Sequence, residues 1–124
     1  MTLQAPLIKG EKKPETCEEQ LRRMCKNIAD SITNPKWWNH GYEDEEPRQE
    51  TASDWMEGTY DIRYYVDSSK RYLGAEIMVA GGGPTIWVNT YTKQVEGYWW
   101  GDKVLEPFID NLGLDDYCEE MYGY

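Results

Sequence analysis

Carboxylates are the chemical groups that stand out in this chain, and they are concentrated in two segments of the sequence. Residues 37–57 carry seven Asp or Glu against one Arg, and residues 102–124 carry seven against one Lys. The positions of interest are Glu43, Asp44, Glu45, Glu46, Asp115, Asp116, Glu119 and Glu120. Blocks of this kind are typical of a solvated surface, or of a surface that attracts a basic partner. In the second case the carboxylates stand where a nucleic acid would present its phosphates, and the chain would act as a DNA mimic.

The second acidic block has the spacing of a crowded helix face. Asp116 and Glu120 are four positions apart, and like charges at that spacing destabilise a helix by roughly 0.2–0.5 kcal/mol per pair. Asp115 and Asp116 lie near the expected start of the helix, where the helix dipole offsets part of this cost. Such a face is either ordinary solvated surface or a surface used by a partner.

Two adjacent tryptophans, Trp37 and Trp38, precede the first acidic run. Tryptophan is a preferred anchor residue in protein interfaces, so one of them could fix a partner next to the acidic run. The alternative is a lid in which both side chains pack on the core of the domain itself.

Three cysteines and the single histidine suggest a second kind of site. Cys17, Cys25, Cys118 and His40 supply the ligand types of a tetrahedral zinc site. On one continuous helix, however, Cys17 and Cys25 would be about 12 Å apart, which is too far for two ligands of one ion. All three cysteines also fall among apolar residues, where small buried cysteines are common. Zinc remains an alternative, in which the chain is a zinc-stabilised structural or adaptor domain.

Catalysis has little support in the sequence. One histidine limits general acid–base chemistry, although a pairing of Cys25 or Cys118 with His40 stays open. The paired carboxylates fall on acidic stretches without basic or apolar neighbours that would tune them. The three consecutive glycines at 81–83 lead into an expected strand, so they predict a hairpin turn and not a phosphate-binding loop. We therefore expect a binding protein and not an enzyme.

Charge and composition define the class of partner. The formal net charge is −10, which repels nucleic acid and anionic membranes and favours a basic, nucleic-acid-binding protein. No apolar run reaches the roughly 18 residues of a membrane span, and residues 1–15 do not resemble a secretory signal. Three cysteines are an odd number, which argues against a disulfide framework. The expected location is the cytoplasm.

The N-terminal half is expected to contain one long helix and one long loop. Within a single domain of 1–124, residues 1–13 are expected to form a loose arm. Thr16 and Glu19 have the spacing of a capping box, and apolar residues recur at helical spacing up to Ile32, which predicts a helix over 17–32. Residues 34–57 are predicted to be a long acidic loop with a short helical turn near 53–57 that Ser53 or Asp54 would cap.

The C-terminal half is expected to contain four strands and then two helices. Alternation of apolar residues predicts strands near 60–66, 73–79, 86–88 and 95–100. Gly97 within the last strand predicts a bulge or close packing of the backbone. A helix is expected from Val104 to Leu112, interrupted or started near Pro107 and ended by Gly113, and a last short helix from Leu114 to Met121. The predicted fold is α+β: a four-stranded antiparallel meander with the N-terminal helix and the C-terminal helices packed on it.

The segments 82–90 (GGPTIWVNT) and 95–101 (VEGYWWG), followed by an acidic C-terminal helix, resemble small acidic proteins carried by phages, plasmids and conjugative elements of Gram-positive bacteria. The resemblance covers roughly residues 72–121 and leaves out the tryptophan pair. It implies a host bacterial cell and a class that includes anti-CRISPR and anti-restriction inhibitors. The expected function is therefore inhibition of a Cas9-type CRISPR effector nuclease, by acidic surfaces that compete with nucleic acid.

Overall fold

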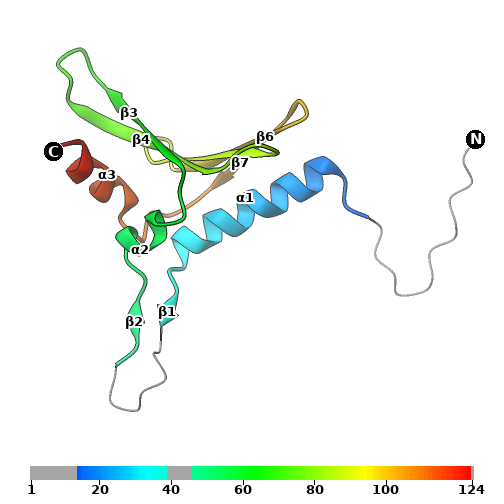
Figure 1. Ribbon diagram of the computed structural model, residues 1–124, viewed down its shortest axis with the longest axis horizontal. Coiled ribbons are helices and arrows are strands. Elements are labelled where there is room, and N and C mark those ends of the chain that lie inside the picture. Colours follow the sequence, from blue (N-terminus) through cyan, green and yellow to red (C-terminus); the bar gives the residue numbers. More distant parts are fainter. Residues whose placement is uncertain (1–13, 39–45, 124) are drawn as a thin grey trace, which may run out of the picture.

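The computed structural model describes residues 14–38 and 46–123 (Figure 1). The predicted arm at 1–13 and most of the first acidic run lie outside the described residues. In chain order the elements are α1 (Cys17–Thr33), β1 (Trp37–Trp38), β2 (Arg48–Gln49), α2 (Ala52–Met56), β3 (Asp61–Val66), β4 (Tyr72–Ala80), β5 (Thr85–Asn89), β6 (Gln94–Trp99), β7 (Asp102–Pro107) and α3 (Leu114–Tyr122). The α+β class is confirmed.

Helix α1 begins where the sequence predicts because Thr16 supplies the cap. The Thr16 hydroxyl accepts a hydrogen bond from the backbone N–H of Glu19 at 3.1 Å. The residues buried on one face of the helix are Leu21, Cys25, Ala29 and Ile32. The helix ends at Thr33, one residue beyond the prediction, before the Asn34 cap.

The central sheet has five antiparallel strands in the order β3-β4-β5-β6-β7, so the prediction of four strands was one short. The missing strand is β7, which lies in the segment predicted to be a helix from Val104 to Leu112. Val104 is buried while its neighbours Lys103 and Leu105 are exposed, which is the alternation of a half-buried strand. Trp100 and Gly101 both have positive φ and turn the chain back so that β7 pairs with β6.

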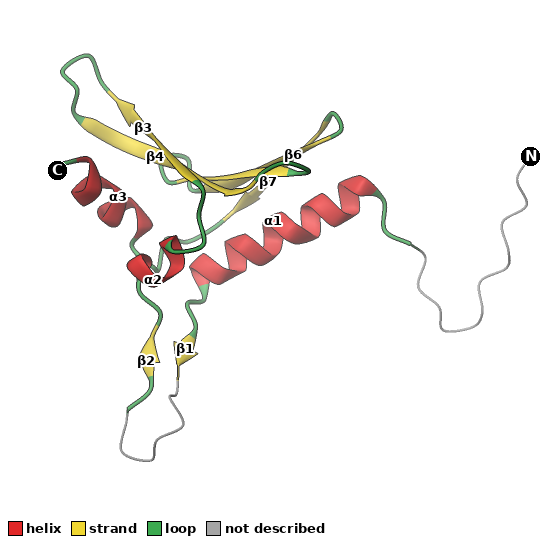
Figure 2. Ribbon diagram, viewed as in Figure 1, coloured by secondary structure: helices red, strands yellow, loops and turns green. Residues whose placement is uncertain are grey.

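Helices α1 and α3 cover one face of this sheet (Figure 2). Gly97 of β6 makes this packing possible, since a Cβ at that position would lie 2.4 Å from Cys25 Sγ and 2.9 Å from Leu21 Cδ1. The prediction of close backbone packing at Gly97 is therefore confirmed. We call the face that carries α1 and α3 the inner face and the opposite one the outer face.

Residues 34–57 contain short elements and are not a structureless loop. Strands β1 and β2 pair as a two-stranded arm that projects from the body of the molecule, and α2 follows (Figure 1). Helix α2 confirms the helical turn that the sequence predicts. Its cap, however, is Thr51, whose side chain accepts from the backbone N–H of Asp54 while the Asp54 carboxylate accepts from the backbone N–H of Thr51.

Helix α3 matches the last predicted helix, but Gly113 stands at its N-terminus with φ of 77° and does not end a preceding helix. The Asp110 carboxylate accepts from the backbone N–H groups of Leu114 at 2.7 Å and Asp115 at 2.9 Å, which satisfies two free donors of the first turn. Leu114 and Cys118 bury one side of the helix against the sheet.

Candidate functional site

The two neighbouring aspartates of α3 lie in opposite environments. The carboxylate of Asp115 accepts hydrogen bonds from the hydroxyls of Tyr72 and Thr90, both at 2.8 Å. Thr90 Oγ1 in turn accepts from the backbone N–H of Ala75 at 2.8 Å. Burial, with a smaller contribution from the Asp115 charge, raises the pKa of Tyr72 well above its ordinary value, so Tyr72 stays a donor. Asp115 therefore joins α3 to β4 and the end of β5, and its carboxylate stabilises the fold through these hydrogen bonds.

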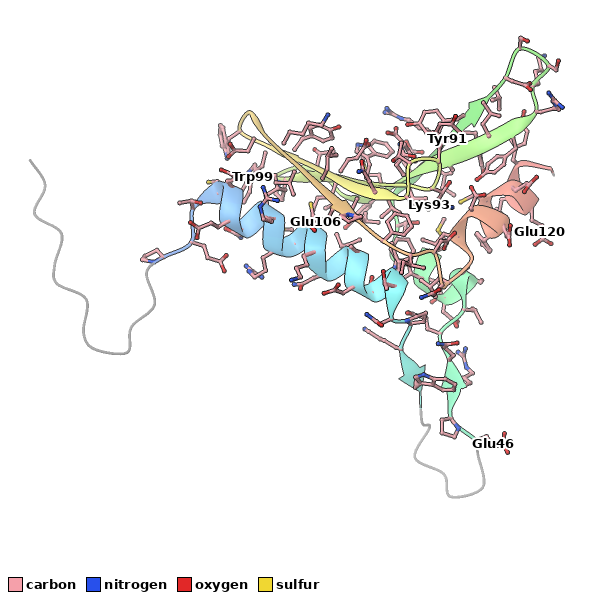
Figure 3. All side chains as sticks on the ribbon, turned by 180° about the vertical axis from the view of Figure 1, so that it is seen from behind. Glu46, Tyr91, Lys93, Trp99, Glu106 and Glu120 are labelled. Atoms are coloured by element: carbon pink, nitrogen blue, oxygen red, sulfur yellow. The ribbon has the colours of Figure 1, made fainter. Side chains whose placement is uncertain are left out.

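The remaining three carboxylates of α3 form an exposed group, the α3 acidic surface: Asp116, Glu119 and Glu120. Their spacing of three and four residues brings them to one side of the helix. Glu120 lies on the side of α3 that faces away from the body of the molecule in Figure 3. In the described part of the chain, none of the three takes part in an ion pair. The helix itself contains no Lys or Arg. Among the residues that the structure describes, the α3 acidic surface is thus a patch of negative charge with no ion-paired cation.

The first acidic run is represented in the structure by Glu46 alone, since Glu43, Asp44 and Glu45 lie outside the described residues. Glu46 is exposed at the end of the arm, whereas Glu120 lies on the body of the molecule (Figure 3). Glu46 and the α3 acidic surface therefore lie on separate parts of the molecule.

Trp37 lies on the arm and is 67% exposed, while Trp38 pairs with Arg48 in the register of β1 and β2. The expected lid, in which the tryptophan packs on the core, does not describe Trp37. An exposed Trp37 fits the alternative of an interface anchor near the acidic run.

An ion pair joins the arm to α2. Arg48 Nη1 lies 2.8 Å from Asp54 Oδ2. Hydrogen bonds from Arg48 and from the Thr51 backbone and hydroxyl hold the pKa of Asp54 well below its usual range. Asp54 belongs to the first acidic block and Asp115 to the second, and the carboxylate of each forms hydrogen bonds within the fold.

The three cysteines proposed as zinc ligands form no metal-binding group within the described residues. Cys17 is exposed at the first residue of α1, Cys25 is buried beneath β6, and Cys118 is buried on α3. In the ranges 14–38 and 46–123 no group of three or more His, Cys, Asp or Glu side chains could hold a metal ion. His40 lies outside the described residues. Burial also raises the pKa of Cys25 to about 11 and that of Cys118 to about 12, so neither is a thiolate at neutral pH.

A group that sequence reasoning missed lies on the outer face of the sheet. Glu76 of β4 stands opposite Asn89 of β5, and Glu96 of β6 stands opposite Trp87 of β5. Burial raises the pKa of the Glu96 carboxyl, and a hydrogen bond with Glu76 raises it further. The register places the two glutamates on the same face of the sheet, diagonally across β5, although they are twenty positions apart in the sequence.

Aromatic side chains surround this carboxyl pair. The Tyr65 hydroxyl accepts from the Asn89 side-chain amide at 3.1 Å, and the rings of Tyr65 and Tyr91 lie 6.1 Å apart between centroids. Trp87 is only 7% exposed although it lies on the outer face, and the Arg63 guanidinium lies over its ring at 4.5 Å. Along β5 the side chains of Trp87 and Asn89 lie on the outer face, because that of Val88 between them lies on the inner face. This alternation in the sequence is the signal that could have identified them.

None of the described helices is long and apolar enough to cross a membrane. Comparison with known proteins finds no matching family model, no matching curated protein and no matching solved structure.

Proposed function

We propose that this chain is an inhibitor of a host defence nuclease, of the Cas9 type, that acts by binding a basic nucleic-acid groove of the enzyme. The observation that carries the proposal is the α3 acidic surface, where Asp116, Glu119 and Glu120 are exposed and form no ion pair within the described residues. A surface with this charge attracts a basic groove and raises the rate of encounter with it.

The distribution of charge supports a macromolecular partner over a small ligand. The chain carries a net charge of −10, and it keeps the α3 acidic surface although like charges on one helix side are unfavourable for that helix. Cas9-type nucleases hold the guide–target duplex in a positively charged channel, which presents the complementary surface.

Glu46 and Trp37 at the arm give the proposal a second contact. Both are exposed: Trp37 lies in β1, which projects from the body (Figure 1), and Glu46 lies at the end of the arm (Figure 3). An acidic helix on the body and an aromatic anchor on an arm would contact separate parts of one partner.

The experiment measures capture and inhibition of purified Cas9-type effectors by the full chain. The test variant is D116N/E119Q/E120Q, and the charge-matched control is E15Q/E18Q/E19Q, which removes three exposed carboxylates near the start of α1. The wild-type chain and the control are expected to block target DNA binding, and the test variant is expected to need at least about ten times more protein. Failure to capture any effector, or equal inhibition by both variants, would refute the proposal.

A further inference from the structure

The outer face of the sheet is not covered by any described element. Helix α1 packs against β6 and β7 and α3 packs against β4, all from the inner side (Figures 1 and 2). An antiparallel sheet with one solvated face normally presents alternating polar side chains there. This outer face carries polar residues such as Arg63, Glu76 and Glu96, and beside them four aromatic residues, Tyr65, Trp87, Tyr91 and Tyr98.

Tyr91 shows that these side chains are arranged closely on the sheet. A Cβ on Gly74 would lie 2.6 Å from Tyr91 Cβ, so Tyr91 folds back over β4 at a position that only glycine permits. Tyr91 is nevertheless 61% exposed, and Tyr98 is 38% exposed. The aromatic side chains of the outer face are therefore packed on the sheet, while Tyr91 and Tyr98 remain accessible to a partner.

The charges on this face favour a cation as the incoming group. Arg63 stands opposite Glu76 in the strand register, yet its guanidinium lies over Trp87 and contacts Asp61 at 4.0 Å. Lys103 lies over the Tyr98 ring at 5.8 Å. Over the described ranges, neither Glu76 nor Glu96 belongs to an ion pair. Glu76 and Glu96 lie on the same face of the sheet on either side of β5, so a cation placed between them could reach both carboxylates.

A guanidinium fits this site better than an ammonium group does. Its planar fork donates to two carboxylates at once, and its flat faces stack on aromatic rings. Arg63 over Trp87 already shows that a guanidinium rests on this surface. A nucleic acid is disfavoured because Glu76 and Glu96 would repel its phosphates, and a second copy is disfavoured by the net charge of −10.

We propose that the outer face of the sheet is a docking surface for an extended, arginine-bearing segment of a partner protein, with one arginine side chain held between Glu76 and Glu96. This surface is separate from the α3 acidic surface, so the inference goes beyond the proposed function. It holds whether or not the partner is a nuclease.

The experiment titrates the ¹⁵N-labelled full chain with the peptide acetyl-Ser-Thr-Arg-Thr-Ser-amide and follows backbone and indole N–H shifts by NMR. The same peptide with citrulline in place of arginine is the uncharged control, and the peptide with lysine compares the two cations. The arginine peptide is expected to shift the signals of Tyr65, Trp87 and Glu96. The citrulline peptide is expected to bind about tenfold more weakly, because it loses a charge-assisted hydrogen bond.

The variants separate this surface from the α3 acidic surface. E76Q/E96Q is expected to weaken binding of the arginine peptide about tenfold and to remain folded, since it removes a repulsive pair. D116N/E119Q/E120Q is expected to bind the peptide as the wild type does. Equal binding of the citrulline peptide, or full binding by E76Q/E96Q, would overturn the proposal. So would binding of oligothymidine by the outer face, or concentration-dependent shifts of the outer face in the absence of peptide.

Discussion

Asp115 and Asp116 are adjacent, chemically identical and on the same helix, yet the structure gives them opposite roles. Asp115 accepts hydrogen bonds from Tyr72 and Thr90 and joins α3 to the sheet. Asp116 is exposed and, with Glu119 and Glu120, forms the α3 acidic surface. The contrast shows that an acidic block is not one functional unit: some of its carboxylates hold the fold, and others are free for a partner.

The contrast extends to the rest of the molecule. Asp54 and Asp110 are used within the fold, the first in the capping box of α2 and the second at the start of α3. Glu76 and Glu96 differ from both groups, because they are half-buried but have each other as neighbours in place of a cation. Substitution of one residue from each group breaks these distinctions one at a time, and the expected effect on stability decreases in the order Asp115, Asp54, Glu96.

Replacement of Asp115 is expected to have the largest effect. Asp115→Ala leaves the hydroxyls of Tyr72 and Thr90 without their acceptor, which we expect to lower the free energy of unfolding by about 2 kcal/mol. Asp116→Ala is expected to change it by less than about 0.5 kcal/mol, since Asp116 is exposed. Denaturant unfolding of both variants checks the comparison, and equal effects would show that the two aspartates do not differ as described.

Asp54 is expected to confer a pH-dependent stabilisation. Its folded pKa lies below the ordinary value of 3.8, so its contribution is present above about pH 4 and is lost as the pH falls further. Asp54→Asn should therefore be less stable than the wild type at neutral pH, and the difference should shrink as the pH approaches 2. Thermal unfolding over pH 2–7 measures this, and a difference that stays constant would contradict the assignment.

Glu96 is expected to act in the opposite direction. Its folded pKa is raised by burial and by Glu76, so its neutral form favours the folded state and that advantage is lost as the pH rises through the raised pKa. Glu96→Gln, which keeps the shape without the charge, should be more stable than the wild type at pH 7 by roughly 0.5 kcal/mol. The gain should disappear near pH 4. Thermal unfolding at both pH values checks it, and a loss of stability at pH 7 would contradict the account.

The sequence predicts most elements of the fold where a local signal is sufficient. Thr16 and Glu19 mark the start of α1, and period-two alternation marks strands β3 to β6. The failure at β7 has a physical reason: Val104, Leu105 and Phe108 fit a helical period as well as a strand, and only the turn at Trp100–Gly101 decides. Pairing with β6 then overrides the helical pattern.

The site is less predictable than the fold because its groups meet only through tertiary structure. Tyr72 and Asp115 are 43 positions apart, and their hydrogen bond needs the packing of α3 on β4. Glu76 and Glu96 meet only when β5 lies between their strands in the observed register. The sequence identifies acidic blocks, but it does not separate the carboxylates that the fold uses from those that it leaves exposed.

The most direct test of the central claim is the salt dependence of nuclease binding by the wild type, by D116N/E119Q/E120Q and by the single variant D115N. Affinity for a Cas9-type effector is measured at about 50 mM and about 300 mM salt, a range over which exposed charges become screened. We predict steep salt dependence for the wild type and for D115N, and weaker binding with a shallower dependence for the triple variant. Equal affinities and slopes for all three chains would contradict the claim that the α3 acidic surface binds the partner.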